Sequence, residues 1–267
     1  MEFPREKLLN KYISIYEKWI APYKPDFEVA GGTTRYVKFN DAWYGLNPYN
    51  KFLITRLINE KNNFPKKPSA KIPKNADPAN YVTLKYDADG TLKVACFPED
   101  TYGKGMAFVY VSKQLTIGYK IKSTEDGITT YELFNFECYE YDDKERMISA
   151  EEFQGSGSAA DDVKINCEYY EYDSGVLSHA WQFKEYQKYP MQITVDLVRK
   201  MMPDRIFNPD HIEYCFQRIS DGLSYTCNHY FRKSQTITRT GHVSEEKLSH
   251  LAENGNAGLF GTVNIQQ

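Results

Sequence analysis

Apolar and polar residues alternate along most of the chain from residue 81 onward. A period of two is typical of strands that bury one face. Outside three hairpins described below, this alternation predicts five strands, at residues 107–111, 115–122, 128–141, 211–219 and 223–232. Neighbouring runs can pair directly, so the pattern favours an antiparallel meander.

Helical periodicity is strongest near the start of the chain. Leu8, Tyr12 and Trp19 belong to an apolar stripe that predicts a helix over residues 4–20, and a second stripe predicts a helix over 49–61. Between them, residues 27–39 alternate around a Gly-Gly pair and predict a hairpin. Residues 61–79 hold four prolines and predict an extended connector. Short helices are expected at 194–201 and from residue 244.

Together these elements predict an α+β protein. We expect a large, twisted, mainly antiparallel β-meander of hairpins with the N-terminal helices packed against it. Residues 1–75 form the helical N-terminal part with its proline- and lysine-rich connector, and residues 76–267 form a β-rich body that folds as one cooperative unit. A chain of 267 residues is long enough to bury a sizeable core.

Three segments share a Tyr-Asp signature followed by a turn. They read YDADGTLKVA (residues 86–95), YDDKERMISA (141–150) and YDSGVLSHA (172–180). An aspartate at this position can accept hydrogen bonds from backbone N–H groups two residues on, and glycine supplies positive φ. In the first segment, Asp89-Gly90 predicts a primed turn with Gly90 at positive φ.

The three segments resemble the YD repeat of Rhs-type proteins, in which Tyr and Asp close a hairpin. The resemblance covers about 55 residues and is local. Its spacing is irregular, the second copy has Glu145 where a glycine belongs, and the third copy is one residue short. The resemblance implies hairpin architecture and brings no catalytic residue.

Charge is distributed unevenly along the chain. Residues 1–75 carry 14 Lys/Arg against 7 Asp/Glu (14 − 7 = +7), whereas residues 131–186 carry 4 against 14 (4 − 14 = −10). The acidic middle is interleaved with tyrosines, which combines long-range attraction for a basic partner with rigid aromatic anchors. Solvated faces that neutralise each other within the fold are the alternative. The predicted partner-binding residues are Tyr139, Glu140, Tyr141, Asp142, Glu168, Tyr170, Glu171, Tyr172 and Trp181.

The five cysteines lie inside predicted strands and form no Cys-x-x-Cys motif. This placement predicts reduced, buried thiols in a reducing compartment. The N-terminus has no apolar signal-peptide core, and no apolar run reaches the length of a membrane-spanning helix. We therefore expect a soluble cytoplasmic protein without a membrane partner.

Candidate chemistry in the sequence is sparse. The spacing His211-x3-Cys215-x11-Cys227-x-His229 invites a zinc interpretation. On a strand, His211 and Cys215 would lie about 13 Å apart, so only Cys227 and His229 remain as weak metal candidates. No G-x-S-x-G motif occurs, and the acidic pairs are interpreted as a solvated face. We expect no cofactor and no catalytic residue.

The preferred function is non-enzymatic protein binding, most concretely by an immunity or antitoxin-like inhibitor whose acidic aromatic β-sheet face binds a basic protein such as a toxin. Nucleic acid is not the expected partner, and the oligomeric state is left open. Two alternatives stay open. One is a hydrolase acting on carbohydrate or nucleic acid with a site dispersed along the sequence, and the other is a small-molecule-binding β-barrel.

Overall fold

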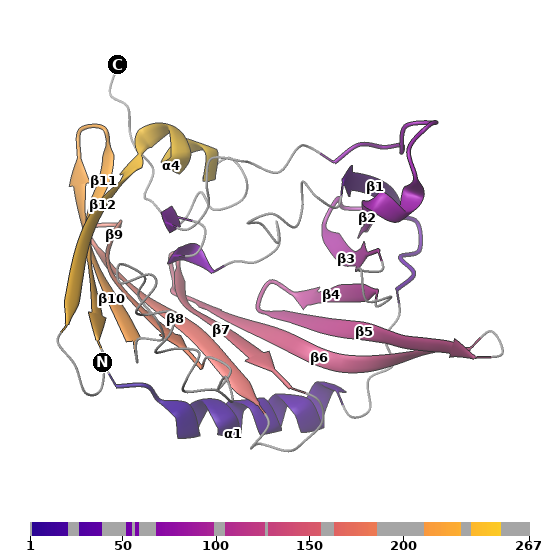
Figure 1. The fold of residues 1–267 in the computed structure, drawn as a ribbon, viewed down its shortest axis with the longest axis horizontal. Coiled ribbons are helices and arrows are strands. Elements are labelled where there is room, and N and C mark those ends of the chain that lie inside the picture. Colours follow the sequence, from indigo (N-terminus) through magenta and orange to yellow (C-terminus); the bar gives the residue numbers. More distant parts are fainter. Residues whose placement is uncertain are drawn as a thin grey trace, which may run out of the picture. The chain divides into compact units, whose positions relative to one another are not determined.

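The computed structural model describes residues 2–20, 27–38, 52–54, 57–58, 68–98, 105–125, 128–155, 163–185, 211–230 and 236–251. Twelve strands form one antiparallel sheet in the order β1 to β12, so each strand neighbours the next strand of the chain (Figure 1). The sheet is not closed, and β1 and β12 are its edges. The predicted meander is confirmed, whereas the described strands do not form the barrel of the small-molecule alternative.

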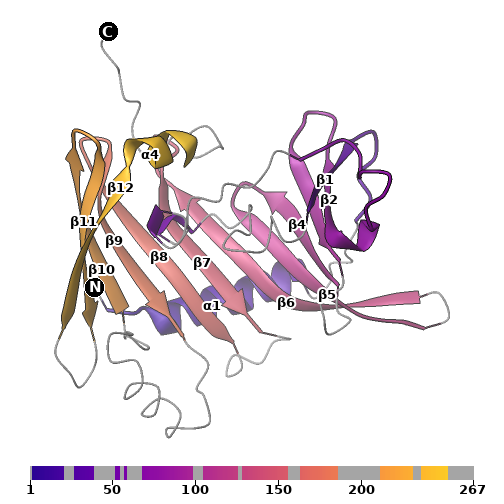
Figure 2. The ribbon, with the colours of Figure 1, turned by 45° about the horizontal axis from the view of Figure 1, so that its top comes forward.

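The strands follow the predicted runs closely. They are β1 (Thr33–Lys38), β2 (Tyr81–Tyr86), β3 (Leu92–Phe97), β4 (Met106–Ser112), β5 (Leu115–Glu125), β6 (Ile128–Tyr141), β7 (Met147–Gln154), β8 (Lys164–Asp173), β9 (Val176–Lys184), β10 (His211–Ile219), β11 (Gly222–Tyr230) and β12 (Ile237–Ser244). Figure 2 shows the strands from β4 to β12 following one another across the sheet. The helical elements are α1 (Arg5–Ile15), the π-helix Tyr16–Ile20, the 3₁₀ helix Pro78–Asn80 and α4 (Glu245–Leu251).

The chain divides into two compact units, which we describe separately. Unit 1 comprises Met1–Pro4, Glu140–Glu151 and Lys164–Gln267, and unit 2 comprises Arg5–Tyr139 and Glu152–Val163. The domain boundary predicted between residues 75 and 76 stays a prediction.

In unit 2, helix α1 packs on the sheet as the apolar stripe predicts. Its buried residues are Leu8 and Tyr12. The ring of Tyr12 stacks on Phe136 of β6 with centroids 5.0 Å apart, and it lies 5.9 Å from the ring of Phe153 of β7. The helix therefore docks on the sheet through the face that carries Leu8 and Tyr12, and Tyr12 meets aromatic rings of β6 and β7.

The hairpin predicted over residues 27–39 is wrong. Residues 27–29 form no strand, and β1 pairs instead with β2, where Val37 lies opposite Val82. Both valines are buried in an apolar cluster of unit 2. The pairing with β2 buries Val37 against Val82 and so removes apolar surface from water, which favours this long-range arrangement.

Several predicted elements lie outside the described residues. The helix at 194–201 is one of them. Of the predicted helix at 49–61, only 52–54 and 57–58 are described, and there Phe52, Leu53, Ile54 and Leu57 are buried. Of the connector, residues 68–79 are described, and Ser69 forms an isolated bridge with Tyr36 of β1.

The Tyr-Asp segments form the β2–β3, β6–β7 and β8–β9 hairpins, with two kinds of turn. In the first, Gly90 N donates to Asp87 O and Asp87 N donates to Thr91 O. Gly90 has φ 77°, as predicted. Ala88 and Asp89, which lie between Asp87 and Gly90, do not have positive φ. The turn is therefore type I followed by a left-handed residue, and the predicted primed turn is wrong.

The second hairpin repeats this turn with Glu145 in place of the glycine. Asp142 N donates to Arg146 O, Glu145 N donates to Asp142 O, and Glu145 has φ 61°. The third hairpin is one residue shorter because its turn is different. Ser174 and Gly175 both have positive φ between the paired residues Asp173 and Val176, which is a type I′ turn.

Replacing Glu145 with glycine should stabilise the protein by about 0.5–1 kcal/mol, because a side chain at positive φ is strained and glycine relieves that strain. The reverse change at the matching position, Gly90→Val, should cost about 1 kcal/mol or more. A Cβ atom at Gly90 would meet nothing within 4 Å, so the cost is conformational. Urea unfolding of both variants checks the pair, and a destabilised Glu145→Gly protein would contradict the assigned turn.

All five cysteines are free thiols within strands, as predicted, but only Cys138, Cys167 and Cys227 are buried, whereas Cys96 and Cys215 are half-buried. Burial raises the pKa of Cys167 to about 12, so this thiol is protonated at neutral pH. Among the described residues, no helix is both long and apolar enough to cross a bilayer.

Candidate functional site

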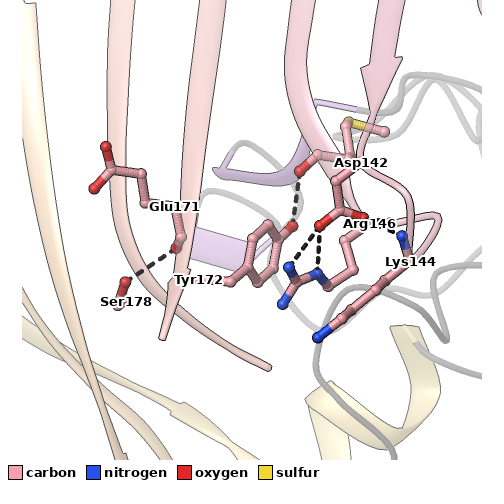
Figure 3. Close-up of polar contacts among 7 residues, drawn as sticks. Asp142, Lys144, Arg146, Glu171, Tyr172 and Ser178 are labelled. Atoms are coloured by element: carbon pink, nitrogen blue, oxygen red, sulfur yellow. Dashed lines mark hydrogen bonds and ion pairs between the residues drawn. The ribbon is translucent and has the colours of Figure 1, made fainter. Parts of the chain in front are cut away.

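The candidate site lies in unit 1, where the β6–β7 and β8–β9 hairpins end. At the first hairpin, Asp142 organises the turn. One carboxylate oxygen, Oδ1, accepts from the backbone N–H groups of Lys144 and Arg146, each at 2.9 Å. The other, Oδ2, is 2.7 Å from Arg146 Nε and 2.5 Å from its terminal nitrogen (Figure 3). The Arg146 side chain therefore lowers the pKa of Asp142, helped by the two backbone donors, and the carboxylate stays charged.

Tyr172 joins this turn to the neighbouring hairpin. Its hydroxyl donates to Met147 O at 2.9 Å, and the Arg146 guanidinium lies over its ring, 4.6 Å from the centroid (Figure 3). Burial raises the pKa of Tyr172 and opposes its ionisation. Arg146 is thus engaged by Asp142 on one side and by an aromatic ring on the other. These contacts make the two hairpin ends one rigid structure.

Exposed carboxylates surround these internal contacts. Asp143, Glu171 and Asp173 are exposed at or near the two turns. None of the three forms an ion pair within the described part of the chain, and the nearby Arg146 is engaged by Asp142. We call Asp143, Glu171 and Asp173 the hairpin-end acids. They present like charge on a fixed framework, which is an arrangement that attracts a basic partner.

Strand alternation separates the acidic middle into two faces of the sheet. On β8, Tyr169 and Glu171 point to one side, with Trp181 and His179 as their partners on β9. Glu213 of β10 and Tyr230 of β11 belong to the same side, because Glu213 pairs with Trp181 and Tyr230 with His211. We call the side of β8–β11 that carries Glu171, His179, Trp181, Glu213 and Tyr230 the acidic face.

The opposite side of β8 carries a buried carboxylate. Glu168 has 0% exposure, and its two carboxylate oxygens accept from Tyr170 Oη and from Gln182 Nε2, each at 2.6 Å. A buried carboxylate is tolerated when hydrogen bonds satisfy it. Glu168 therefore serves the interior of the sheet, and it is not available to a partner in this structure.

The predicted partner-binding residues consequently have different surroundings. Glu140 and Glu171 are exposed, whereas Tyr141, Asp142 and Tyr172 are half-buried. Burial raises the pKa of Tyr141 to about 12. The remaining four, Tyr139, Glu168, Tyr170 and Trp181, are buried. Tyr139 belongs to unit 2 and the other eight to unit 1. The structure thus brings the exposed acids to a surface and places most of the aromatic anchors inside.

A repeated motif that is longer than the Tyr-Asp signature explains why Tyr139, Glu168 and Tyr170 are buried. The sequence Glu-x-Tyr-Glu-Tyr-Asp occurs at 137–142 and again at 168–173. In unit 2, Tyr139 Oη donates to Glu137 Oε2, as Tyr170 does to Glu168 in unit 1. The corresponding positions before the first Tyr-Asp pair are Val82 and Leu84, both buried. The Glu–Tyr pairs therefore occupy positions that an apolar pair fills in β2.

The weak metal candidates do not form a metal site in the described part of the chain. Cys227 Sγ and His229 Nε2 are 3.6 Å apart on one face of β11, as predicted, but no third His, Cys, Asp or Glu among the described residues completes a cluster with them. Burial raises the pKa of Cys227 and lowers that of His229. A protonated thiol beside a neutral imidazole is not an activated nucleophile.

No protein-family model matches the chain, and neither does any curated protein or solved structure.

Proposed function

We propose that this protein binds a basic protein partner in the cytoplasm without catalysing a reaction, as an immunity or antitoxin-like inhibitor does. The contact surface consists of the hairpin-end acids and the adjoining acidic face of unit 1. The similarity of the hairpins to YD repeats accounts for the framework only and contributes no functional residue.

The observation that carries this proposal is the charge of the hairpin ends. Asp143, Glu171 and Asp173 are exposed, and none is neutralised by a described basic side chain. The turns that hold them are fixed by Asp142, Arg146 and Tyr172, so little conformational freedom is lost on binding. Rigid like charges raise the association rate with a basic partner and give that rate a strong salt dependence.

The test is a charge reversal restricted to the surface. Changing Asp143, Glu171 and Asp173 together to lysine should weaken binding of a toxin encoded beside this gene by at least about tenfold at low salt. The same binding by the unaltered protein should weaken steeply as salt rises. Glu168 and Asp142 are left unchanged, because each holds hydrogen bonds on which the hairpins depend.

A control variant reverses three exposed acids elsewhere. Glu17, Asp89 and Glu246 are exposed residues that do not belong to the two hairpin ends, and changing them to lysine alters the net charge by the same amount. This control should bind within a factor of about two of the unaltered protein, since the three residues lie outside the proposed contact surface and exposed charges are screened by salt. Equal binding by both triple variants, with circular dichroism unchanged, would rule out the hairpin-end acids as the contact surface.

A further inference from the structure

Three residues from each of β9, β10 and β11 form a contiguous aromatic patch on the acidic face. The register places Glu213 at its centre, opposite Trp181 of β9 and Asn228 of β11. On one side, His211 stacks on Tyr230 with centroids 4.4 Å apart and on Phe183 at 5.5 Å. On the other side, His179 stacks on Trp181 at 6.0 Å. The central carboxylate is therefore framed by aromatic rings. The patch comprises His179, Trp181, Phe183, His211, Glu213, Cys215, Thr226, Asn228 and Tyr230.

Two of these aromatic residues hold the carboxylate in place. Trp181 Nε1 donates to Glu213 Oε1 at 3.2 Å, and Tyr230 Oη donates to Glu213 Oε2 at 2.8 Å. The hydrogen bond to Glu213 is the main reason that the pKa of Tyr230 is raised, because it favours the protonated phenol. Each carboxylate oxygen keeps a further lone pair. Glu213 is thus oriented in advance and retains capacity to accept hydrogen bonds.

No described cation neutralises Glu213. It is half-buried, and no arginine or lysine of the described residues forms an ion pair with it. His211, Glu213 and Tyr230 are all partly exposed, so a group from outside can reach both the carboxylate and the rings. The patch joins the hairpin-end acids directly, since His179 lies opposite Glu171.

We propose that this patch receives an arginine side chain of the basic partner, with the guanidinium paired to Glu213 and lying against the ring of Tyr230, because the ring of His211 is already stacked between Phe183 and Tyr230. Guanidinium fits the site better than ammonium does, because its planar fork pairs with a carboxylate through two N–H groups and stacks on aromatic faces. This inference deepens the proposed function by naming the side chain that docks at the centre of the acidic face.

A peptide assay on the full chain tests the inference without a protein partner. The probe is acetyl-Gly-Arg-Gly-amide, and the readout is the indole N–H resonance of Trp181 in a ¹H–¹⁵N NMR spectrum, assigned with a Trp181→Phe variant. That proton is bonded to Glu213, so it reports directly on the carboxylate. The arginine peptide should shift this resonance saturably in the millimolar range. The lysine peptide should bind at least about fivefold more weakly, and the citrulline peptide should cause no shift.

Glu213→Gln should weaken the arginine peptide by at least about tenfold, because the charge is lost while one oxygen acceptor is kept. Glu246→Gln is the matched control, since it removes an exposed charge that belongs neither to the patch nor to the hairpin-end acids and should leave the titration unchanged. Absence of a saturable shift, equal binding of the lysine peptide, or equal binding by Glu213→Gln would each overturn the inference. The peptide titration tests only the arginine site at Glu213, whereas the toxin experiment tests the hairpin-end acids. Each experiment can therefore fail without deciding the other.

Discussion

Replacing Glu168 with alanine should lower the free energy of unfolding by about 2–4 kcal/mol. Glu168 is completely buried, and its removal leaves the Tyr170 hydroxyl and the Gln182 amide without the acceptors that they now use. An unsatisfied buried donor costs more than the hydrogen bond contributed, since water cannot reach it. Equilibrium urea unfolding of the full chain measures the change.

Glu171→Ala, three residues further along β8, is the matched control. Glu171 is exposed, so its truncation should change stability by no more than about 0.5 kcal/mol. A triple variant that makes residues 168, 170 and 182 apolar, as Val82 and Leu84 are in β2, should recover much of the loss, because it removes donors and acceptor together. If alanine at 168 and at 171 had equal effects, the buried network would have no energetic role.

Gly222→Ala should destabilise the protein by about 3 kcal/mol or more. Gly222 begins β11 with φ 149°, a conformation that residues with a side chain rarely adopt. A Cβ atom there would lie 2.0 Å from Val243 O and 3.0 Å from His242 Nε2. The first of these atoms belongs to the backbone of β12, so relief requires the two strands to separate. Thermal unfolding should show a lower melting temperature.

Gly175→Ala measures the energetic cost of positive φ without a steric clash of the added Cβ atom. Gly175 also has positive φ, at 87°, but a Cβ atom there would meet nothing within 4 Å. Its replacement should cost only about 1 kcal/mol, which is the conformational term alone. Equal costs at Gly175 and Gly222 would show that the close approach to β12 does not matter.

Much of the sheet could be predicted because its strands carry the alternation themselves. The predicted bounds of β6 and β10 coincide with the observed ones. β12 was missed for a physical reason. It is an edge strand in which Ile237 to Thr240 are all exposed and only Val243 is buried, so one apolar side chain does not make an alternating pattern. Its pairing with β11 rests on backbone hydrogen bonds, which leave no pattern in the side chains.

The candidate site was predicted less completely, because alternation does not say which face of a strand is buried. Around β8 and β9 both faces are largely covered, so Glu168 and Tyr170 are buried although Glu171 beside them is exposed. The repeated Glu-x-Tyr-Glu-Tyr-Asp motif was the available signal, since a glutamate two residues before a tyrosine on a strand shares its face. Glu213 gave no such signal, because register with β9 and β11 creates its surroundings.

The sequential order of the strands has a consequence for how this protein can change over evolutionary time. Every strand neighbours only those that precede and follow it in the chain, and the antiparallel directions alternate. Deleting or duplicating one strand would place two strands of the same direction side by side at that point, unless all later strands reversed direction relative to the earlier ones, whereas gaining or losing two adjacent strands keeps the antiparallel alternation throughout. The sheet can therefore widen or narrow by whole hairpins. Relatives of this chain should differ in strand number by even numbers, with the Tyr-Asp hairpins as the units that are gained or lost.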